Sequence, residues 1–213
     1  MPKPKAGVDG SGMHINMSLS KNGQNIFYDG ADANGLSQEA YYFLGGILKH
    51  IKGMTLILNP LVNSYKRLMP GYEAPTHIAW SGRNRTPLIR IPATRGEETR
   101  IELRSPDPAC NPYLALAICL AAGLDGIKNK IVPPDAMEGN MHLLTPEELE
   151  ERGIESLPKN LQEAVEEFEK DPLMKEVLGE EVCGKYSMAK KKEWNDYNAT
   201  VSQWEIDSYL LRI

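Results

Sequence analysis

Apolar and polar residues alternate with a period of two in three short segments, and this pattern predicts half-buried β-strands. The segments are residues 13–20, 89–91 and 100–104. In the third segment we expect Arg100, Glu102 and Arg104 on one face of the strand, opposite Ile101 and Leu103. Charged side chains would then line one face of a sheet whose other face is apolar.

Helical spacing of apolar residues predicts two main helices. The first covers residues 37–55, and Ser37 is a suitable N-cap. The second covers residues 112–130, with Asn111 as the N-cap and Pro112 at the first helical position. Because the centre of the second helix is almost wholly apolar, we expect it to be the buried one.

The order of the elements predicts an α+β fold. An antiparallel sheet is expected from residues about 10–28 and 75–104, with the two main helices packed over it. Shorter helices are expected near residues 145–152 and 160–170. A last helix over about 188–211 has aromatic residues at helical spacing, which indicates a packing face and makes it a candidate for subunit contacts.

Composition and charge restrict the function. The 213 residues carry a net charge of −5, which argues against general nucleic-acid binding. The three cysteines lack metal-type spacing, and their odd number suits a reducing cytoplasm. The longest apolar stretch is too short to span a bilayer, so we expect a cytoplasmic protein without membrane contact.

Six arginines fall within the 22 residues from 83 to 104. The arginine side chain presents a fixed fork of donors that fits carboxylate and phosphate oxygens. Arg90 on one strand and the Arg100–Arg104 face on another therefore suit a polyanion, together with a cation held by Glu102. The alternative is an exposed strand pair whose surface ion pairs contribute about 0–1 kcal/mol each.

Two further segments carry candidate chemistry. His14 lies on the polar face of the first strand, and the preceding Gly10-Ser-Gly12 permits close approach of the backbone to a ligand. A single histidine on a strand is more often structural than a ligand. Residues 67–75 contain two prolines and a glycine around Glu73, so they form a loop that either holds a carboxylate over a site as a lid or is an ordinary surface loop.

Several ordered stretches together resemble the catalytic domain of bacterial type I glutamine synthetases. They include GSGMHINMSL, NPLVNSYKRLMPGYEAP, IRIP, RIELRSPDP, NPYLALA and AGLDGIKNKI, which together span much of the chain. The resemblance implies a fold like that catalytic domain, a guanido-kinase-like fold. It also implies that residues 1–213 are the C-terminal part of the domain, without the N-terminal β-grasp domain and the first part of the catalytic domain.

The resemblance further implies the reaction and the partners. The intact enzyme would join ammonia to the γ-carboxylate of L-glutamate through γ-glutamyl phosphate, with ATP as co-substrate and Mg²⁺ or Mn²⁺ as cofactor. It would work as a homo-oligomer, a dodecamer with active sites between subunits. Because most of the metal-binding glutamates would lie outside these residues, we expect the isolated chain to be inactive.

Residue by residue, the resemblance makes His14 and Glu102 ligands of the divalent ion. Gly10 would belong to the loop that holds the substrate glutamate, and Arg67 and Arg104 would bind its carboxylates. These roles agree with the residue types, since arginine suits a carboxylate and histidine with glutamate suits a cation.

The same resemblance places Asn16 and Ser18 at the nucleotide. Arg85, Arg90 and Arg100 match arginines that face the transferred phosphoryl group and the nucleotide phosphates, with Arg85 in a catalytic role. Glu73 matches a glutamate on a closing loop, which would shield the site and take a proton from ammonium.

This sequence departs from the family pattern at several positions. Asp9 replaces an asparagine found in many members, and Asn16 replaces a histidine of the adenylylated subtype. His142 lies in the segment aligned with that subtype's modifiable tyrosine, so adenylylation is not expected. Glu97 or Glu98 falls where some members have a lysine near phosphate. Two alternatives stay open: a ligase that joins glutamate to another amine, of the γ-glutamylpolyamine type, and a non-catalytic anion-binding or assembly module.

Overall fold

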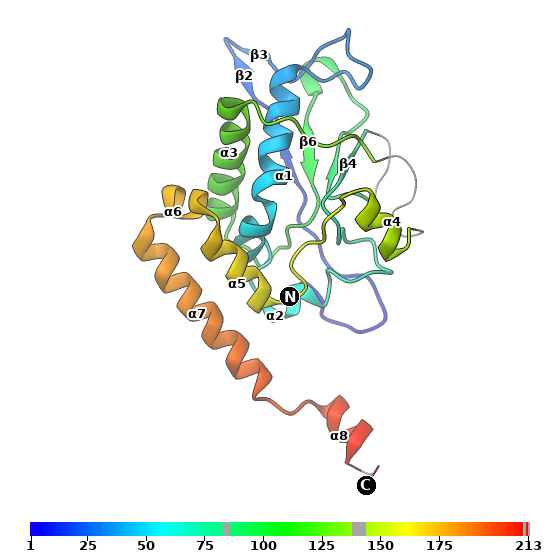
Figure 1. The fold of residues 1–213 in the computed structure, drawn as a ribbon, viewed down its shortest axis with the longest axis vertical. Coiled ribbons are helices and arrows are strands. Elements are labelled where there is room, and N and C mark those ends of the chain that lie inside the picture. The colour runs from blue at the N-terminus through cyan, green and yellow to red at the C-terminus, as the bar shows by residue number, and fades with distance from the viewer. Residues whose placement is uncertain (83–85, 138–143, 211, 213) are drawn as a thin grey trace.

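Helix α1 (Gln38–Leu58) lies in the middle of the fold (Figure 1). The structure, a computed structural model, describes residues 1–82, 86–137, 144–210 and 212. The Ser37 side chain accepts a hydrogen bond from the Ala40 backbone N–H, as the sequence predicted for the N-cap. Most side chains of α1 are buried, so this helix forms the centre of the hydrophobic core.

Helix α3 (Pro112–Asn129) packs along α1, and glycine allows the close approach. A Cβ atom on Gly46 would lie 2.1 Å from the Ala122 carbonyl oxygen, and one on Gly126 would lie 2.0 Å from the Tyr42 carbonyl oxygen. The Asn111 side chain accepts hydrogen bonds from the first turn, as predicted. The two helices therefore meet backbone to backbone.

The prediction that the second main helix is the buried one was wrong. The side of α3 away from α1 exposes four large apolar residues, namely Tyr113, Leu116, Leu120 and Leu124, which are 83%, 55%, 48% and 46% exposed. The reason is that the buried side of α3 is made mostly of small residues together with Ile118, while most of its large apolar residues lie on the opposite side. The apolar composition of the helix did not reveal which side would be covered.

The main sheet has the strand order β1 (Ile15–Met17), β6 (Ile101–Leu103), β5 (Ile89–Arg90), β4 (Trp80–Ser81). The pairs β1–β6 and β5–β6 are antiparallel, which agrees with the predicted α+β class. The pair β4–β5 is parallel, with Trp80 opposite Ile89, so the expectation of a wholly antiparallel sheet needs correction. Alternation of side chains predicts a strand but not the direction of its neighbour.

Residues 20–25 form a separate hairpin of β2 (Ser20–Lys21) and β3 (Gln24–Asn25). Asn22 and Gly23 have φ angles of 55° and 80°, as a two-residue hairpin turn requires. The first strand is therefore shorter than predicted, because the chain leaves the main sheet after Met17 and starts this hairpin.

The remaining helices follow the sheet and α1. They are α2 (Val62–Tyr65), the 3₁₀ turn η1 (Gly96–Glu98), α4 (Pro146–Glu151), α5 (Leu161–Lys170), α6 (Pro172–Leu178), α7 (Glu180–Asn198) and α8 (Gln203–Tyr209). The helices predicted near residues 145–152 and 160–170 correspond to α4 and α5. The last predicted helix is divided into α7 and α8, because Ser202 forms a capping box with Glu205 and starts a new helix.

The buried imidazole of His50 connects three helices. Its Nδ1 lies 2.8 Å from Asp171 Oδ2 at the start of α6, and its Nε2 lies 3.0 Å from Asp125 Oδ2 on α3. Burial alone lowers the pKa of His50, but the hydrogen bonds to Asp171 and Asp125 outweigh it and raise the pKa above its ordinary value. Both ring nitrogens therefore donate when the histidine is charged.

In the part of the chain that the structure describes, every helix is too short or too polar to cross a membrane.

Candidate functional site

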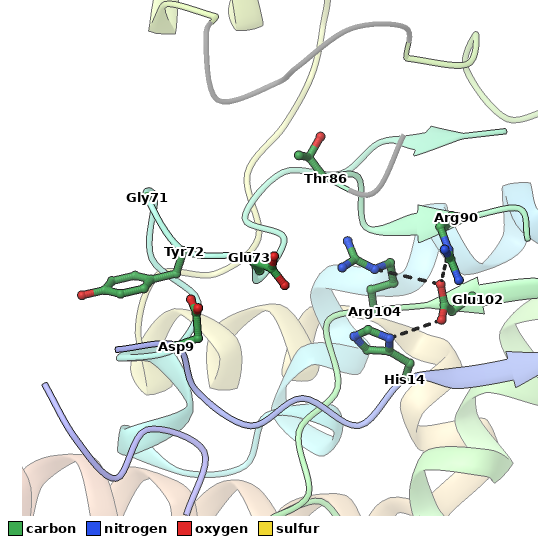
Figure 2. A pocket seen from close by; sticks show the side chains of 9 residues that line it. All are labelled: Asp9, His14, Gly71, Tyr72, Glu73, Thr86, Arg90, Glu102 and Arg104. Atoms are coloured by element: carbon green, nitrogen blue, oxygen red, sulfur yellow. Dashed lines mark hydrogen bonds and ion pairs between the residues drawn. The ribbon is translucent and has the colours of Figure 1, made fainter. Parts of the chain in front are cut away.

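Two adjoining cavities, of about 700 and 400 Å³, lie between the segment before β1, the loop of residues 67–75 and the strands β5 and β6 (Figure 2). Both cavities are lined by Asp9, His14, Tyr72, Glu73 and Arg104. The larger cavity also reaches Gly71, Thr86, Arg90 and Glu102, and the smaller one also reaches Gly10, Gly12, Arg67 and Ala74. Seven of the residues to which the resemblance gave a role in the site therefore line these two adjoining cavities, namely Gly10, His14, Arg67, Glu73, Arg90, Glu102 and Arg104.

The sheet register brings His14 and Glu102 together. Asn16 on β1 is opposite Glu102 on β6, so His14 follows two positions away on the same face. His14 Nδ1 lies 3.3 Å from Glu102 Oε1, and both side chains face the larger cavity (Figure 2). This is the juxtaposition expected from the alternation of polar residues in the two strands.

Two arginines approach the other oxygen of Glu102. Arg90 Nε on β5 lies 2.5 Å from Glu102 Oε2, and Arg104 Nε lies 4.0 Å from the same atom. Glu102 is only 7% exposed, so these ion pairs are not ordinary surface contacts. The alternative of a solvated strand pair does not describe this part of the sheet.

The surroundings of His14 favour its neutral form. Burial lowers the pKa of His14, the positive charge of Arg104 lowers it further, and Glu102 only partly opposes them. A neutral imidazole keeps one nitrogen lone pair that is available to a cation, and the neighbouring Glu102 carboxylate can offer an oxygen to the same ion.

The donors fit part of a divalent metal site. One imidazole nitrogen and the Glu102 carboxylate suit Mn²⁺ or Mg²⁺, but an octahedral ion needs about six donors. Within the described ranges, no group of three or more histidine, cysteine, aspartate or glutamate residues has a geometry for binding metal. The two predicted ligands therefore lie close to each other, and a divalent ion bound to them would need further donor atoms.

Arg67 forms the floor of the smaller cavity. Its guanidinium donates to the Ser105 and Arg104 carbonyl oxygens at 2.6 and 3.2 Å, and it has no carboxylate partner among the residues that the structure describes. Burial lowers the pKa of Arg67 and Arg104 adds to this, although Asp107 opposes it. A Cβ atom on Gly12 would lie 2.5 Å from Arg67 Nη2. A buried cation beside a glycine-lined space suits an anionic ligand.

Glu73 is exposed on the loop opposite the sheet. Figure 2 shows its carboxylate directed toward Arg104, whereas the Tyr72 ring extends to the other side of the loop and also lines both cavities. Asp9 also lines both cavities, so the residue that departs from the family pattern lies in the site. The site therefore combines a cationic sheet face with two carboxylates on facing loops.

Three predicted residues lie beyond the cavity lining. Arg100 Nε donates to Asn16 Oδ1 at 3.1 Å, and Arg100 Nη1 donates to Thr94 Oγ1 at 2.7 Å. Ser18 is exposed farther along the polar side of the same segment. Arg85 and His142, which the sequence analysis also singled out, fall outside the described residues.

The sequence analysis did not select Thr86, which lines the larger cavity, or Lys3, which contacts the Glu73 loop. No local pattern marks Thr86. The two prolines around Lys3 indicate an extended segment, but they do not show what its side chain contacts.

Comparison with known proteins adds a family. The sequence profile described as "Glutamine synthetase, catalytic domain" matches residues 1–209. Curated glutamine synthetases from Methanosarcina mazei and Clostridium saccharobutylicum are 58% and 57% identical over 210 residues, which are 99% of this chain and 47% of each relative. A glutamine synthetase from Thermotoga maritima is 55% identical over the same share of this chain.

Two solved structures have a similar fold. "GmaS/ADP complex-Conformation 1" has a TM-score of 0.87 and 40% identity, and the match covers 99% of this chain and 48% of that chain. "Apo GmaS without ligand" has a TM-score of 0.82 and 39% identity, with coverage of 99% and 47%. The chain spans about half the length of the relatives it matches.

Proposed function

Because the chain belongs to the glutamine synthetase family, we propose that it is the C-terminal part of the catalytic domain of a cytoplasmic glutamate–ammonia ligase. The observation that carries this proposal is the shared cavity in which His14, Glu102 and Arg90 face the Glu73 loop. The β-grasp domain and the first part of the catalytic domain would come from the rest of the protein, consistent with the 47% coverage of the relatives.

The reaction has two steps. A γ-carboxylate oxygen of L-glutamate attacks the terminal phosphorus of ATP, the bond to the β-phosphate oxygen breaks, and ADP leaves. Ammonium first loses a proton to become ammonia, which attacks the acyl carbon of γ-glutamyl phosphate. The bond between that carbon and the phosphate oxygen breaks, and phosphate leaves with the proton that the attacking nitrogen loses as the amide forms. Since both steps bring anions together, positioning and charge neutralisation provide most of the catalysis.

His14 and Glu102 would hold the divalent ion, Mg²⁺ or Mn²⁺, which neutralises phosphate charge when it is bound. Glu102 already lies in contact with Arg90, so the carboxylate orients the arginine toward the same space. This arrangement places positive charge where the transferred phosphoryl group would pass.

The substrate glutamate fits the smaller cavity. Gly12 leaves room beside the Arg67 guanidinium, since a Cβ atom on Gly12 would lie 2.5 Å from Arg67 Nη2, and Gly10 packs closely against the Pro2 carbonyl oxygen. Arg67 supplies a buried cation without an ion-pair contact to a carboxylate of the described residues, and Arg104 lines both cavities. The carboxylates of glutamate would bind to these arginines, with the γ-carboxylate toward the larger cavity.

ATP would extend along the sheet face beyond Glu102. Arg90 and Arg100 would face its phosphates, Asn16 orients Arg100, and Ser18 follows on the same side. The catalytic role of Arg85 remains a proposal from the family pattern.

Glu73 would take one proton from ammonium and cover the site. A closed loop matters because water would hydrolyse the acyl phosphate. In the full-length enzyme, Glu73→Gln should lower the rate of glutamine formation by about 10²–10⁴-fold, the usual contribution of a general base. The exposed Glu150→Gln on α4 is the control and should keep the rate.

This test also separates the alternatives. Glutamine formed from ammonium supports the proposal, whereas a product formed only with a polyamine would indicate a γ-glutamylpolyamine-type ligase. ATP binding without either product would indicate a non-catalytic module.

We further propose a homo-oligomer, a dodecamer in the intact enzyme. Helix α7 extends away from the core and α8 lies at its far end (Figure 1). Trp204, Tyr209 and Leu210 on this arm are 66%, 53% and 67% exposed. Another copy of the chain would cover these apolar side chains.

A further inference from the structure

The loop that carries Glu73 is held by the burial of Ala74 in the hydrophobic core but makes no hydrogen bonds of its own among the described residues. Among the described residues, no hydrogen bond has a donor or an acceptor in residues 70–75. One side of the loop faces the functional cavities, and its other side, at Met69 and Pro70, borders a third cavity of about 670 Å³. Side-chain contacts, and not backbone hydrogen bonds, must therefore hold Glu73 in position.

The ammonium group of Lys3 contacts this loop. Lys3 Nζ lies 3.4 Å from the centroid of the Tyr72 ring and also donates a hydrogen bond to the Val8 carbonyl oxygen. The residue is 9% exposed and has no ion pair with a carboxylate within the described ranges. An aromatic face and a carbonyl oxygen thus take the place of a counterion.

The backbone of Lys3 is held from two sides. Its N–H donates to Asn63 Oδ1 at 2.8 Å, and its carbonyl oxygen accepts from Asn63 Nδ2 at 3.0 Å. The neighbouring Pro2 carbonyl oxygen accepts from the Ser11 N–H at 2.8 Å. The ammonium group therefore extends from a segment held by hydrogen bonds, so its contact with Tyr72 restrains the loop.

Adjacent residues of the loop point in different directions. The Tyr72 ring and the Glu73 carboxylate extend to different sides of the loop, and both residues line the cavities (Figure 2). A restraint on the Tyr72 ring therefore also restrains the backbone that carries Glu73. The hydrogen bond to Val8 connects the same ammonium group to the segment that carries Asp9 and Gly10, on the facing wall.

We infer that Lys3 is a positioning residue that fixes the Glu73 loop against the glycine-rich segment through the Tyr72 ring. The inference rests on the proposed function for the role of Glu73, but the restraint itself does not. Lys3 touches no reacting atom, so its loss should impair the step that uses ammonium more than the binding of ATP.

The experiment compares Lys3→Met, Lys3→Arg and Tyr72→Leu in the full-length protein, with Lys5→Met as the control because Lys5 is exposed in the same segment. Cleavage after Glu73 by a glutamate-specific protease should be about 10-fold faster in Lys3→Met and Tyr72→Leu, in proportion to the loss of a desolvated cation–π contact. It should stay at the wild-type rate in Lys5→Met. Arginine also binds aromatic faces, so Lys3→Arg should restore most of the protection.

Kinetics supply the second readout. We expect kcat/KM for ammonium to fall about 10-fold in Lys3→Met, with KM for ATP changed by less than about 2-fold. Unchanged cleavage after Glu73 in both Lys3→Met and Tyr72→Leu would overturn the inference. If Lys3→Met does not fold, the result for Tyr72→Leu alone tests it. If the wild-type protein forms no glutamine, the proposed function fails, while the cleavage rates still show whether Lys3 restrains the loop.

Discussion

His14 Nδ1 lies 3.3 Å from Glu102 Oε1, although 88 positions separate the two residues in the chain. The antiparallel pairing of β1 with β6 causes this proximity, since it puts alternate residues of both strands on one face. The same face carries the arginines that contact Glu102 or line the cavity. The register of these two three-residue strands therefore determines which side chains meet in the site.

The pair should bind Mn²⁺ weakly in the isolated 213 residues. His14 and Glu102 supply only part of an octahedral ligand set, so the other positions would be water. Titration calorimetry should show weak binding that is lost in His14→Ala. Tight Mn²⁺ binding that His14→Ala leaves unchanged would mean that the ion is held elsewhere.

Asp9 should weaken the binding of L-glutamate. Its carboxylate lines the same cavity as Arg67, where the substrate carboxylates are proposed to bind. In the full-length enzyme Asp9→Asn should lower KM for glutamate about 5-fold, as expected for about 1 kcal/mol between charges in a hydrated site. The effect should shrink at high salt.

The matched control is Asp135→Asn, an exposed carboxylate that does not line either cavity. It should leave KM unchanged. A higher KM for glutamate in Asp9→Asn would show that Asp9 helps to hold the substrate rather than repelling it.

The His50 cluster should make stability depend on pH. The folded-state pKa of His50 is raised, so its contribution is complete below about pH 6.5 and is lost as the pH rises through the folded value. Urea unfolding at pH 6 should show His50→Gln to be about 2 kcal/mol less stable than wild type, the scale of a charged buried hydrogen bond. The difference should decrease toward pH 9.

Lys49→Gln is the control for this cluster. Lys49 Nζ contacts the same Asp125 at 3.0 Å, but lysine does not titrate in this range. Its smaller effect should be nearly constant from pH 6 to pH 9. A His50→Gln difference that grows with pH would contradict the assignment of a charged imidazole.

The arm formed by α7 and α8 should support assembly. The double substitution Trp204→Ser and Leu210→Ser removes large exposed apolar surface. The full-length oligomer should therefore dissociate at a higher protein concentration than the wild type. Light scattering measures the mass. An unchanged mass across dilution would show that α8 makes no subunit contact that matters.

Local sequence signals predicted much of the fold and the site. Caps at Ser37 and Asn111 fixed the starts of the two main helices, and alternation predicted the shared face of Glu102 and Arg104. These features depend on neighbours within a few positions. Arg85 lies outside the described residues, so its role in the site stays a prediction.

Features that depend on distant packing were not predictable in the same way. The parallel pairing of Trp80 with Ile89 depends on how the intervening chain returns. The outward side of α3, with Leu120, depends on which face of the helix meets α1. The contact of Lys3 with Tyr72 joins segments 69 positions apart and has no local signature.

The most direct test of the account compares the isolated 213 residues with a full-length chain that contains them. Both would be given ATP, Mg²⁺, L-glutamate and ammonium, with glutamine measured by mass spectrometry and folding checked by circular dichroism. The account predicts glutamine from the full-length chain and none from the folded 213 residues, because a misplacement of about 1 Å already costs on the order of 10²-fold in rate and most of the metal ligands are proposed to lie outside these residues. Sustained glutamine synthesis by the isolated residues would contradict it, since His14 and Glu102 would then suffice as the protein's ligands to the metal.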